Sequence, residues 1–247
     1  MRRWALLAMG VGAYALALIV LAPATLLDIA LERSSAGRLR LAEAQGTLWS
    51  GSGRLEIRDA RQRIGVGKRL TWRMAPTSLL RGQLTLEVQT DSSAPHFPVT
   101  ISLSSVEIAQ ADMALPAAAL GLIVRELAPL DLTGDLLLHV KHLKIDRQQI
   151  DADATLQWTS ASSALSPISP LGGYEMRVEP AGPALRCTLR TLQGPLEVQG
   201  EGSWTHGSKP VFRATARVPL QLEQQLAPLL RLIAVERGEG RFDLELR

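Results

Sequence analysis

The sequence predicts a mainly β protein: an N-terminal transmembrane helix, then a curved, largely antiparallel sheet (an open barrel or a sandwich) with two or three short helices. Two observations lead to this fold class. Residues 4–27 are uncharged and mostly apolar. After Asp28, most of the chain alternates apolar and polar residues with the period of two that half-buried strands require. The chain lacks a strand–helix–strand rhythm, which argues against a doubly wound nucleotide-binding fold.

The first 27 residues have the pattern of a membrane anchor. Arg2 and Arg3 precede the uncharged run, whose about 24 residues would span roughly 36 Å as a helix. The hydrocarbon core of a bilayer is about 30 Å thick, and the positive-inside rule places the N-terminus in the cytoplasm. We expect the helix to continue past Asp28 towards Leu31. The residues assigned to the anchor are Trp4, Leu7, Leu16, Ile19 and Leu21.

A cleaved signal peptide is the alternative interpretation of the same segment. Ala22-Pro23-Ala24 matches the Ala-x-Ala cleavage pattern, and a basic start is common to both kinds of segment. The apolar core from Trp4 to Leu21 is longer than the usual 7–15 residues of a signal core, and Pro23 lies inside the cleavage pattern. We therefore expect the anchor to be retained.

The alternating pattern in the remaining chain predicts roughly a dozen short strands. One face of each strand is polar almost throughout, which favours an antiparallel sheet. The apolar phase changes between Leu136 and Ile145, and a bulge near Lys141 and His142 would account for the change. Clear alternation occurs in residues 54–58, 69–74, 84–88, 152–158, 212–218 and 242–246.

Three segments depart from the strand pattern. The pattern of Pro76–Gly82 predicts one helical turn. The pattern of Pro116–Ala128 predicts a short helix stopped by Pro129. An apolar stripe from Leu222 to Ile233 predicts a helix that Pro228 would kink or divide.

Domain boundaries follow from these elements. Residues 1–31 form the basic start and the anchor, and residues 32–247 form one β domain on the far side of the membrane. The clearest loops are Asp91–Pro98 and Ser160–Pro170. A subdivision of the β domain near residues 160–170 is an option that the sequence leaves open.

Composition excludes a nucleic-acid partner. The net charge is +3, but two of the 27 basic residues, Arg2 and Arg3, precede the anchor, which leaves 25 against 24 acidic residues. The chain has no basic stripe of the kind that nucleic acid requires. Cys187 is the only cysteine, so no internal disulfide can form. It shares an alternation face with Leu185 and Leu189, which favours a buried apolar cysteine over a nucleophile.

Motifs for catalysis and for metal or cofactor binding are missing. The sequence has four histidines, and an odd offset within a strand directs His139 and His142 to opposite faces. Gly65-Val-Gly67-Lys68 lacks the spacing of a phosphate loop. Asp151 and Asp153 share a solvated strand face. We predict no catalytic residue, no cofactor and no metal site.

Four tryptophans lie in or at the ends of predicted strands: Trp49, Trp72, Trp158 and Trp204. Buried tryptophan supplies much of the apolar area of a β core, which is the first interpretation. The second is that some of the rings line an apolar groove or a docking face.

In order along the chain, short motifs resemble the type II (general) secretion pathway protein N family. The matching segments, which follow the basic start and single anchor, are Gln45–Gly51, Leu70–Arg73, Pro76–Gly82, Gly134–Leu138, Leu156–Trp158, Leu171–Tyr174 and Gln193–Gly200. The resemblance covers nearly the whole chain. It implies an accessory, single-pass component of the Gram-negative inner membrane with a periplasmic β domain, in the machinery that exports folded proteins across the outer membrane. It carries over no catalytic residue.

Three functions follow from the sequence. The first is an assembly component that contacts other inner-membrane proteins of the secretion system, with membrane lipid as a partner of the anchor and exposed strand edges available for pairing. The alternative is a periplasmic groove that binds lipid or another hydrophobe. A periplasmic enzyme ranks last, because it would need paired carboxylates or a nucleophile and base in a cleft.

Overall fold

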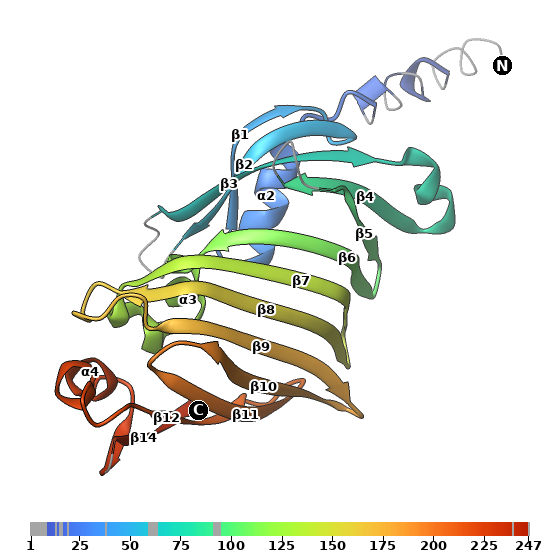
Figure 1. The fold of residues 1–247 in the computed structure, drawn as a ribbon. Helices are drawn as coiled ribbons and strands as arrows, with labels where there is room; N and C mark the ends of the chain where they lie inside the picture. Colours follow the sequence, from blue (N-terminus) through green and yellow to red (C-terminus); the bar gives the residue numbers. More distant parts are fainter. Residues whose placement is uncertain are drawn as a thin grey trace. The chain divides into compact units, whose positions relative to one another are not determined.

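A computed structural model describes residues 9–12, 14, 17–18, 20–37, 39–58, 64–90, 95–238 and 240–246. The chain divides into two compact units, residues 1–93 and 94–247. The boundary lies within the predicted loop Asp91–Pro98. Both units are built from antiparallel strands (Figure 1), which confirms the mainly β fold class with few helices.

The first unit is a four-strand meander against which helix α2 packs. Its strand order is β1-β2-β3-β4, and each strand pairs with its neighbour in sequence. The elements are α2 (Thr25–Ser34), β1 (Leu39–Gly46), β2 (Ser50–Arg58), β3 (Ile64–Met74), the 3₁₀ helix η1 (Pro76–Arg81) and β4 (Gln83–Thr90). The predicted turn at Pro76–Gly82 is thus confirmed as η1.

The second unit is a larger meander whose order changes only at its end. It runs β5-β6-β7-β8-β9-β10-β11-β12-β14-β13, so the final strand lies between β12 and β13. The strands are β5 (Phe97–Ser102), β6 (Ser105–Pro116), β7 (Leu132–Asp146), β8 (Ile150–Ser163), β9 (Gly172–Ala181), β10 (Ala184–Gln193), β11 (Glu197–Thr205), β12 (Val211–Arg217), β13 (Val235–Gly238) and β14 (Arg241–Leu246). The helices are α3 (Ala118–Ile123), η2 (Arg125–Leu130) and α4 (Glu223–Leu230).

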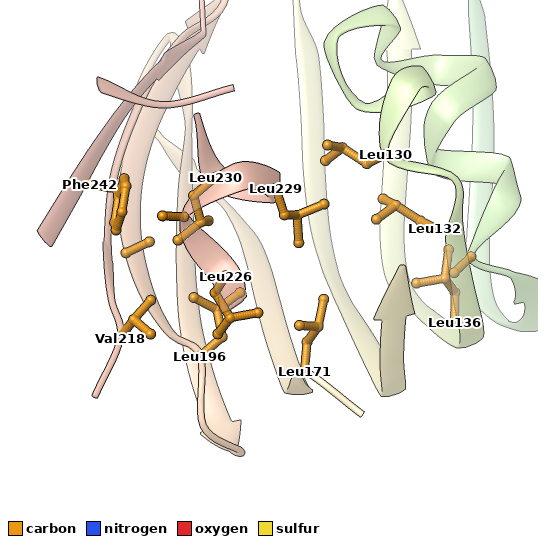
Figure 2. Packing of buried hydrophobic residues seen from close by; sticks show 13 residues of the cluster. Leu130, Leu132, Leu136, Leu171, Leu196, Val218, Leu226, Leu229, Leu230 and Phe242 are labelled. Atoms are coloured by element: carbon orange, nitrogen blue, oxygen red, sulfur yellow. The ribbon is translucent and has the colours of Figure 1, made fainter. Parts of the chain in front are cut away.

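The core of the second unit shows that its sheet curves. One contiguous cluster contains Leu136 of β7 and Phe242 of β14, joined by the leucines of α4. Five strands separate β7 from β14, so a flat sheet would hold these two strands about 29 Å apart, far more than the ~10 Å diameter of a helix. In Figure 2 the leucines of α4 lie between Phe242 on one side and Leu136 on the other. The sheet therefore curves around its helices.

The predicted bulge in β7 is confirmed. Val140 pairs with Ala154 and His142 with Asp153, which leaves Lys141 as the extra residue. The extra residue changes the parity of the strand, so Leu143 returns to the side of Val140. By the same shift, the prediction that His139 and His142 point to opposite faces was wrong: their register partners Thr155 and Asp153 lie two residues apart on β8 and share a face.

Two predicted boundaries were also wrong in detail, and a third predicted helix is not divided. The helix predicted at Pro116–Ala128 is interrupted at Val124, whose backbone is extended, and it resumes as η2, which includes Pro129. Pro228 lies inside α4, and α4 continues to Leu230. The loop predicted from Ser160 begins only after Ser163, because β8 continues to pair with β7 and β9 up to that point.

The predicted anchor falls mostly outside the described residues. Trp4, Leu7, Leu16 and Ile19 are not described, and Leu21 is 71% exposed. In the described part of the chain, no helix combines the length and the apolar character needed to cross a bilayer. The helix does not run on to Leu31 as expected. α2 begins afresh at Thr25, after an isolated β-bridge between Pro23 and Thr47.

Candidate functional site

Strand β13 forms an exposed edge of the second unit's sheet. It stands at the end of the strand order, and within the described ranges its strand partner is β14. All four of its residues are exposed, and Val235 is 61% exposed. The outer side of an edge strand presents backbone N–H and C=O groups to which a strand of another chain can be added.

Charged side chains restrict what can pair with this edge. The Arg231 guanidinium donates to Glu236 at 2.8 Å, and Arg237 Nε donates to an Asp243 carboxylate oxygen at 2.9 Å. A short edge strand with charged residues is a common protection against indiscriminate pairing. A strand that adds to β13 must therefore fit beside these two ion pairs.

The edge strand of the first unit differs, because α2 packs beside it. The backbone N–H of Leu41 in β1 donates to an Asp28 carboxylate oxygen of α2 at 2.8 Å. Arg40 of β1 approaches the other Asp28 oxygen at 3.6 Å. Part of the β1 backbone is thus already paired within the chain, which makes β13 the better candidate for a docking edge.

A charged cavity of about 880 Å³ lies beside β13, on the polar face of strands β10 to β14. Register pairing explains why its polar residues converge: Arg190 pairs with Gln199, Gln199 with Thr215 and Thr215 with Asp243, so they form one row across four strands. The lining residues are Thr188, Leu189, Arg190, Gln199, Gly200, Glu201, Arg213, Ala214, Thr215, Arg237, Asp243 and Leu244. Arg237 belongs to β13, so the cavity and the edge form one continuous surface.

Buried Glu175 of β9 fixes one arginine of this cavity. Its side chain is only 6% exposed, and one carboxylate oxygen accepts from Arg190 Nη2 at 2.7 Å and from Arg177 Nε at 2.8 Å. The Gln157 amide donates to the other oxygen at 3.3 Å. Desolvation alone would raise the pKa of Glu175, but the bonds from Arg190, Gln157 and Arg177 outweigh it and lower the pKa below its ordinary value.

Replacing Glu175 with glutamine is expected to lower the free energy of unfolding at pH 7 by about 1–3 kcal/mol, because charge-assisted bonds to a buried group are lost. A carboxyl with a lowered folded-state pKa stabilises the fold above its unfolded pKa, and this contribution is lost as the pH falls through the folded value. The difference in the free energy of unfolding between wild type and Glu175→Gln should therefore be constant above about pH 5 and should become smaller below about pH 4.3. Urea unfolding at a series of pH values measures it.

Glu201→Gln is the matched control, because Glu201 lines the same cavity but is exposed. Its effect on the free energy of unfolding should stay within about 0.5 kcal/mol. An equal loss in both variants, or a Glu175→Gln gap that does not change with pH, would contradict a role for the buried carboxylate.

The opposite, apolar face of the second unit is incompletely covered. Register places Leu156, Met176 and Leu189 in one row across β8, β9 and β10. Each of these side chains is half-buried, and of the three only Leu156 packs against the main core cluster. Because the sheet curves around this face, these side chains line its concave interior.

The four tryptophans are divided between the two units. In the first unit, Trp72 is 4% exposed and its ring N–H donates to the backbone of the β1–β2 turn, while Trp49 is half-buried in that turn. In the second unit, Trp158 lies 5.7 Å from Tyr174, ring centre to ring centre, and packs against the core. The ring N–H of Trp204 donates to the Ser208 carbonyl at 3.0 Å within a hairpin.

Cys187 lies on the apolar face, as its alternation predicts. It pairs with Val178 of β9 and is half-buried. Burial raises the pKa of its thiol, which reduces the thiolate fraction at neutral pH. Over the described residues, no group of three or more His, Cys, Asp or Glu side chains is arranged to hold a metal ion.

Sequence reasoning missed both Glu175 and β13. One signal for Glu175 was available: Glu175 and Arg177 are two residues apart and therefore share a strand face, which favours an ion pair. No comparable signal identifies β13 as an edge, because that depends on where β14 inserts.

Comparison with known proteins identifies the family. A family model described as type II secretion system (T2SS), protein N, matches residues 37–245, which is more than half of the chain. No curated protein and no solved structure gives a significant match. The family predicted from the short motifs is confirmed, and the chain belongs to the protein N family of the type II secretion system.

Proposed function

We propose that this protein is an accessory component of the inner membrane in type II secretion, and that it acts by protein–protein contact and not by catalysis. In this proposal residues 4–21 anchor the chain with its N-terminus in the cytoplasm, and residues 22–27 belong to the folded first unit. Both β units lie in the periplasm, where the β13 edge binds another component of the secretion machinery. The observation that carries the docking proposal is that all four residues of β13 are exposed beside the charged cavity.

Membership of the protein N family supports a role in type II secretion, and the chemistry of the β13 surface supports contact with another protein. A strand from a partner can add to β13 through its backbone, which gives affinity without a particular sequence. Arg190, Arg213 and Arg237 together with Glu201 and Asp243 line the cavity. Such a mixed-charge surface gives specificity through complementary charges on the partner.

The test is site-specific photocrosslinking in cells that carry the secretion system. A benzophenone amino acid at Val235 in the full-length protein should give a crosslinked product with another inner-membrane secretion protein, identified by mass spectrometry. The same probe at Leu103, which is 91% exposed in the turn between β5 and β6, is the matched control and should give little or none of that product.

Two outcomes contradict the proposal. Equal crosslinking from Val235 and Leu103 would show that β13 has no special role in docking. Undiminished secretion in cells from which the protein has been deleted would contradict a function in the secretion process itself.

A groove that binds lipid or another hydrophobe is the second candidate, favoured by the half-buried row Leu156, Met176 and Leu189. The same purified complexes discriminate between the two candidates. Lipid retained in mild detergent without a crosslinked protein partner would favour the groove, and a protein partner without bound lipid would favour docking.

A further inference from the structure

The segment Ala22–Ala24, here called the strap, joins the N-terminal helical residues directly to the first unit. Leu21 still makes a helical bond, from its backbone N–H to the Ala17 carbonyl at 2.9 Å. The next residue, Ala22, already accepts from the N–H of Leu48 at 2.8 Å. The last helical bond and the first bond to the β1–β2 turn of the folded unit are thus on consecutive residues.

The strap is part of the folded unit. Ala24 donates to the Gly46 carbonyl at 3.2 Å, and Pro23 forms an isolated antiparallel bridge with Thr47. Ala24 is 1% exposed and packs with Leu41 and Trp72 in the core of this unit. Cleavage after Ala24 would therefore remove a core residue and these backbone bonds, which favours the retained segment over the signal-peptide alternative.

Two connections of the first unit lie at the end of the sheet that the strap reaches. The β1–β2 turn, Thr47–Trp49, is bound to the strap itself. The N–H of Met74, the last residue of β3, donates to the Trp49 carbonyl at 2.6 Å. The β3–β4 connection at Pro76–Gly82 follows directly, so it must lie at the same end.

The helical residues before the strap are apolar and exposed. Met9, Val11, Tyr14, Val20 and Leu21 are each between 54% and 71% exposed. An exposed apolar surface of this kind is typical of contact with a membrane or a partner, and it continues without a spacer into the strap.

We propose that the strap, the turn Thr47–Trp49 and the connection Pro76–Gly82 form a membrane-proximal end that lies in the headgroup region of the bilayer. This proposal rests on the membrane anchoring proposed above. The headgroup region adds only about 5–8 Å on each side of the hydrocarbon core. The helix ends at Leu21, and Ala22 is already hydrogen-bonded to the first unit. Because no linker separates the two, the first unit must lie close to the membrane surface.

The composition of this end suits a bilayer interface. Trp49 is half-buried in the turn, and tryptophan is enriched at headgroup depth because its ring is apolar and its N–H is polar. Arg73 is exposed at the end of β3, where a guanidinium can pair with an anionic phosphate. The partner of this surface is therefore a bilayer that contains anionic lipid.

The test places an environment-sensitive fluorophore at two exposed positions of the full-length protein. In a Cys187→Ser background, Thr77→Cys labels the membrane-proximal end and Ser34→Cys labels the far end of α2; both residues are exposed. α2 begins at the strap and runs about 15 Å to Ser34. Each labelled protein is reconstituted into vesicles of phosphatidylethanolamine and phosphatidylglycerol.

We expect the label at residue 77 to emit at shorter wavelength, to be quenched by nitroxide attached to lipid, and to be quenched several-fold less by aqueous iodide than the label at residue 34. Extraction at alkaline pH tests anchoring separately. If the protein stays in the membrane but the label at residue 77 behaves like that at residue 34, the membrane-proximal end is refuted while the anchor stands. If the protein is extracted, the anchoring fails and this inference fails with it.

Discussion

Replacing Phe242 with alanine is expected to lower the free energy of unfolding by about 3–5 kcal/mol. Phe242 is 0% exposed and belongs to the cluster formed by α4, β7 and β12. The sheet curves around this cluster, so neighbouring strands cannot close the space without loss of the contacts to α4. Urea unfolding followed by far-ultraviolet circular dichroism measures the loss.

Leu220→Ala is the control for Phe242→Ala, because Leu220 lies in the same unit but is 71% exposed. Its effect should stay within about 0.5 kcal/mol. If Phe242→Ala were equally mild, the α4 leucines would not depend on Phe242, and the account of a core enclosed by the curved sheet would be wrong.

Replacing Trp72 with alanine should destabilise the first unit by about 3–5 kcal/mol. The ring is 4% exposed, and its N–H donates to the Thr47 and Leu48 carbonyls at 3.3 and 3.2 Å. An ideal Cβ on Gly51 would lie 2.5 Å from Cζ2 of Trp72, so the ring fits closely against the backbone of β2. Its loss removes core packing and a bond that holds the membrane-proximal turn.

Two further variants, Trp72→Phe and Trp204→Ala, test whether Trp72 stabilises the core or belongs to a docking face. Trp72→Phe keeps most of the apolar area but leaves two carbonyls without their donor, which should cost about 1–2 kcal/mol. Trp204 is half-buried in a hairpin, and its loss should be less than half that of Trp72→Ala. Unfolding is again followed by circular dichroism. A Trp72→Ala protein with unchanged stability but impaired secretion would instead assign Trp72 to a docking face.

The strands were predictable because their evidence is local. Alternation in segments such as 152–158 and 242–246 reflects one buried and one solvated face, and each falls within an observed strand, β8 and β14. The bulge at Lys141 was predictable for the same reason, since the apolar phase changes at that point.

Features that depend on distant pairing were not predictable. His139 and His142 share a face because the bulge adds one residue, and this overrides the simple parity of the strand. The bridge between Pro23 and Thr47 joins the strap to a turn that local sequence patterns do not identify as its partner. The burial of Glu175 depends on Gln157 and Arg190 from neighbouring strands, which spacing along one strand does not reveal.

The insertion of β14 between β12 and β13 has a consequence for the chain during synthesis. The earlier strands of the second unit from β6 to β12 pair with a neighbour made just before them, so they can assemble in the order of translation. β13 must wait for β14, its strand partner, and β14 also supplies Phe242. A polypeptide truncated before Arg241 would therefore lack both the ordered β13 and the core residue beneath it, so only full-length copies can display the proposed docking edge.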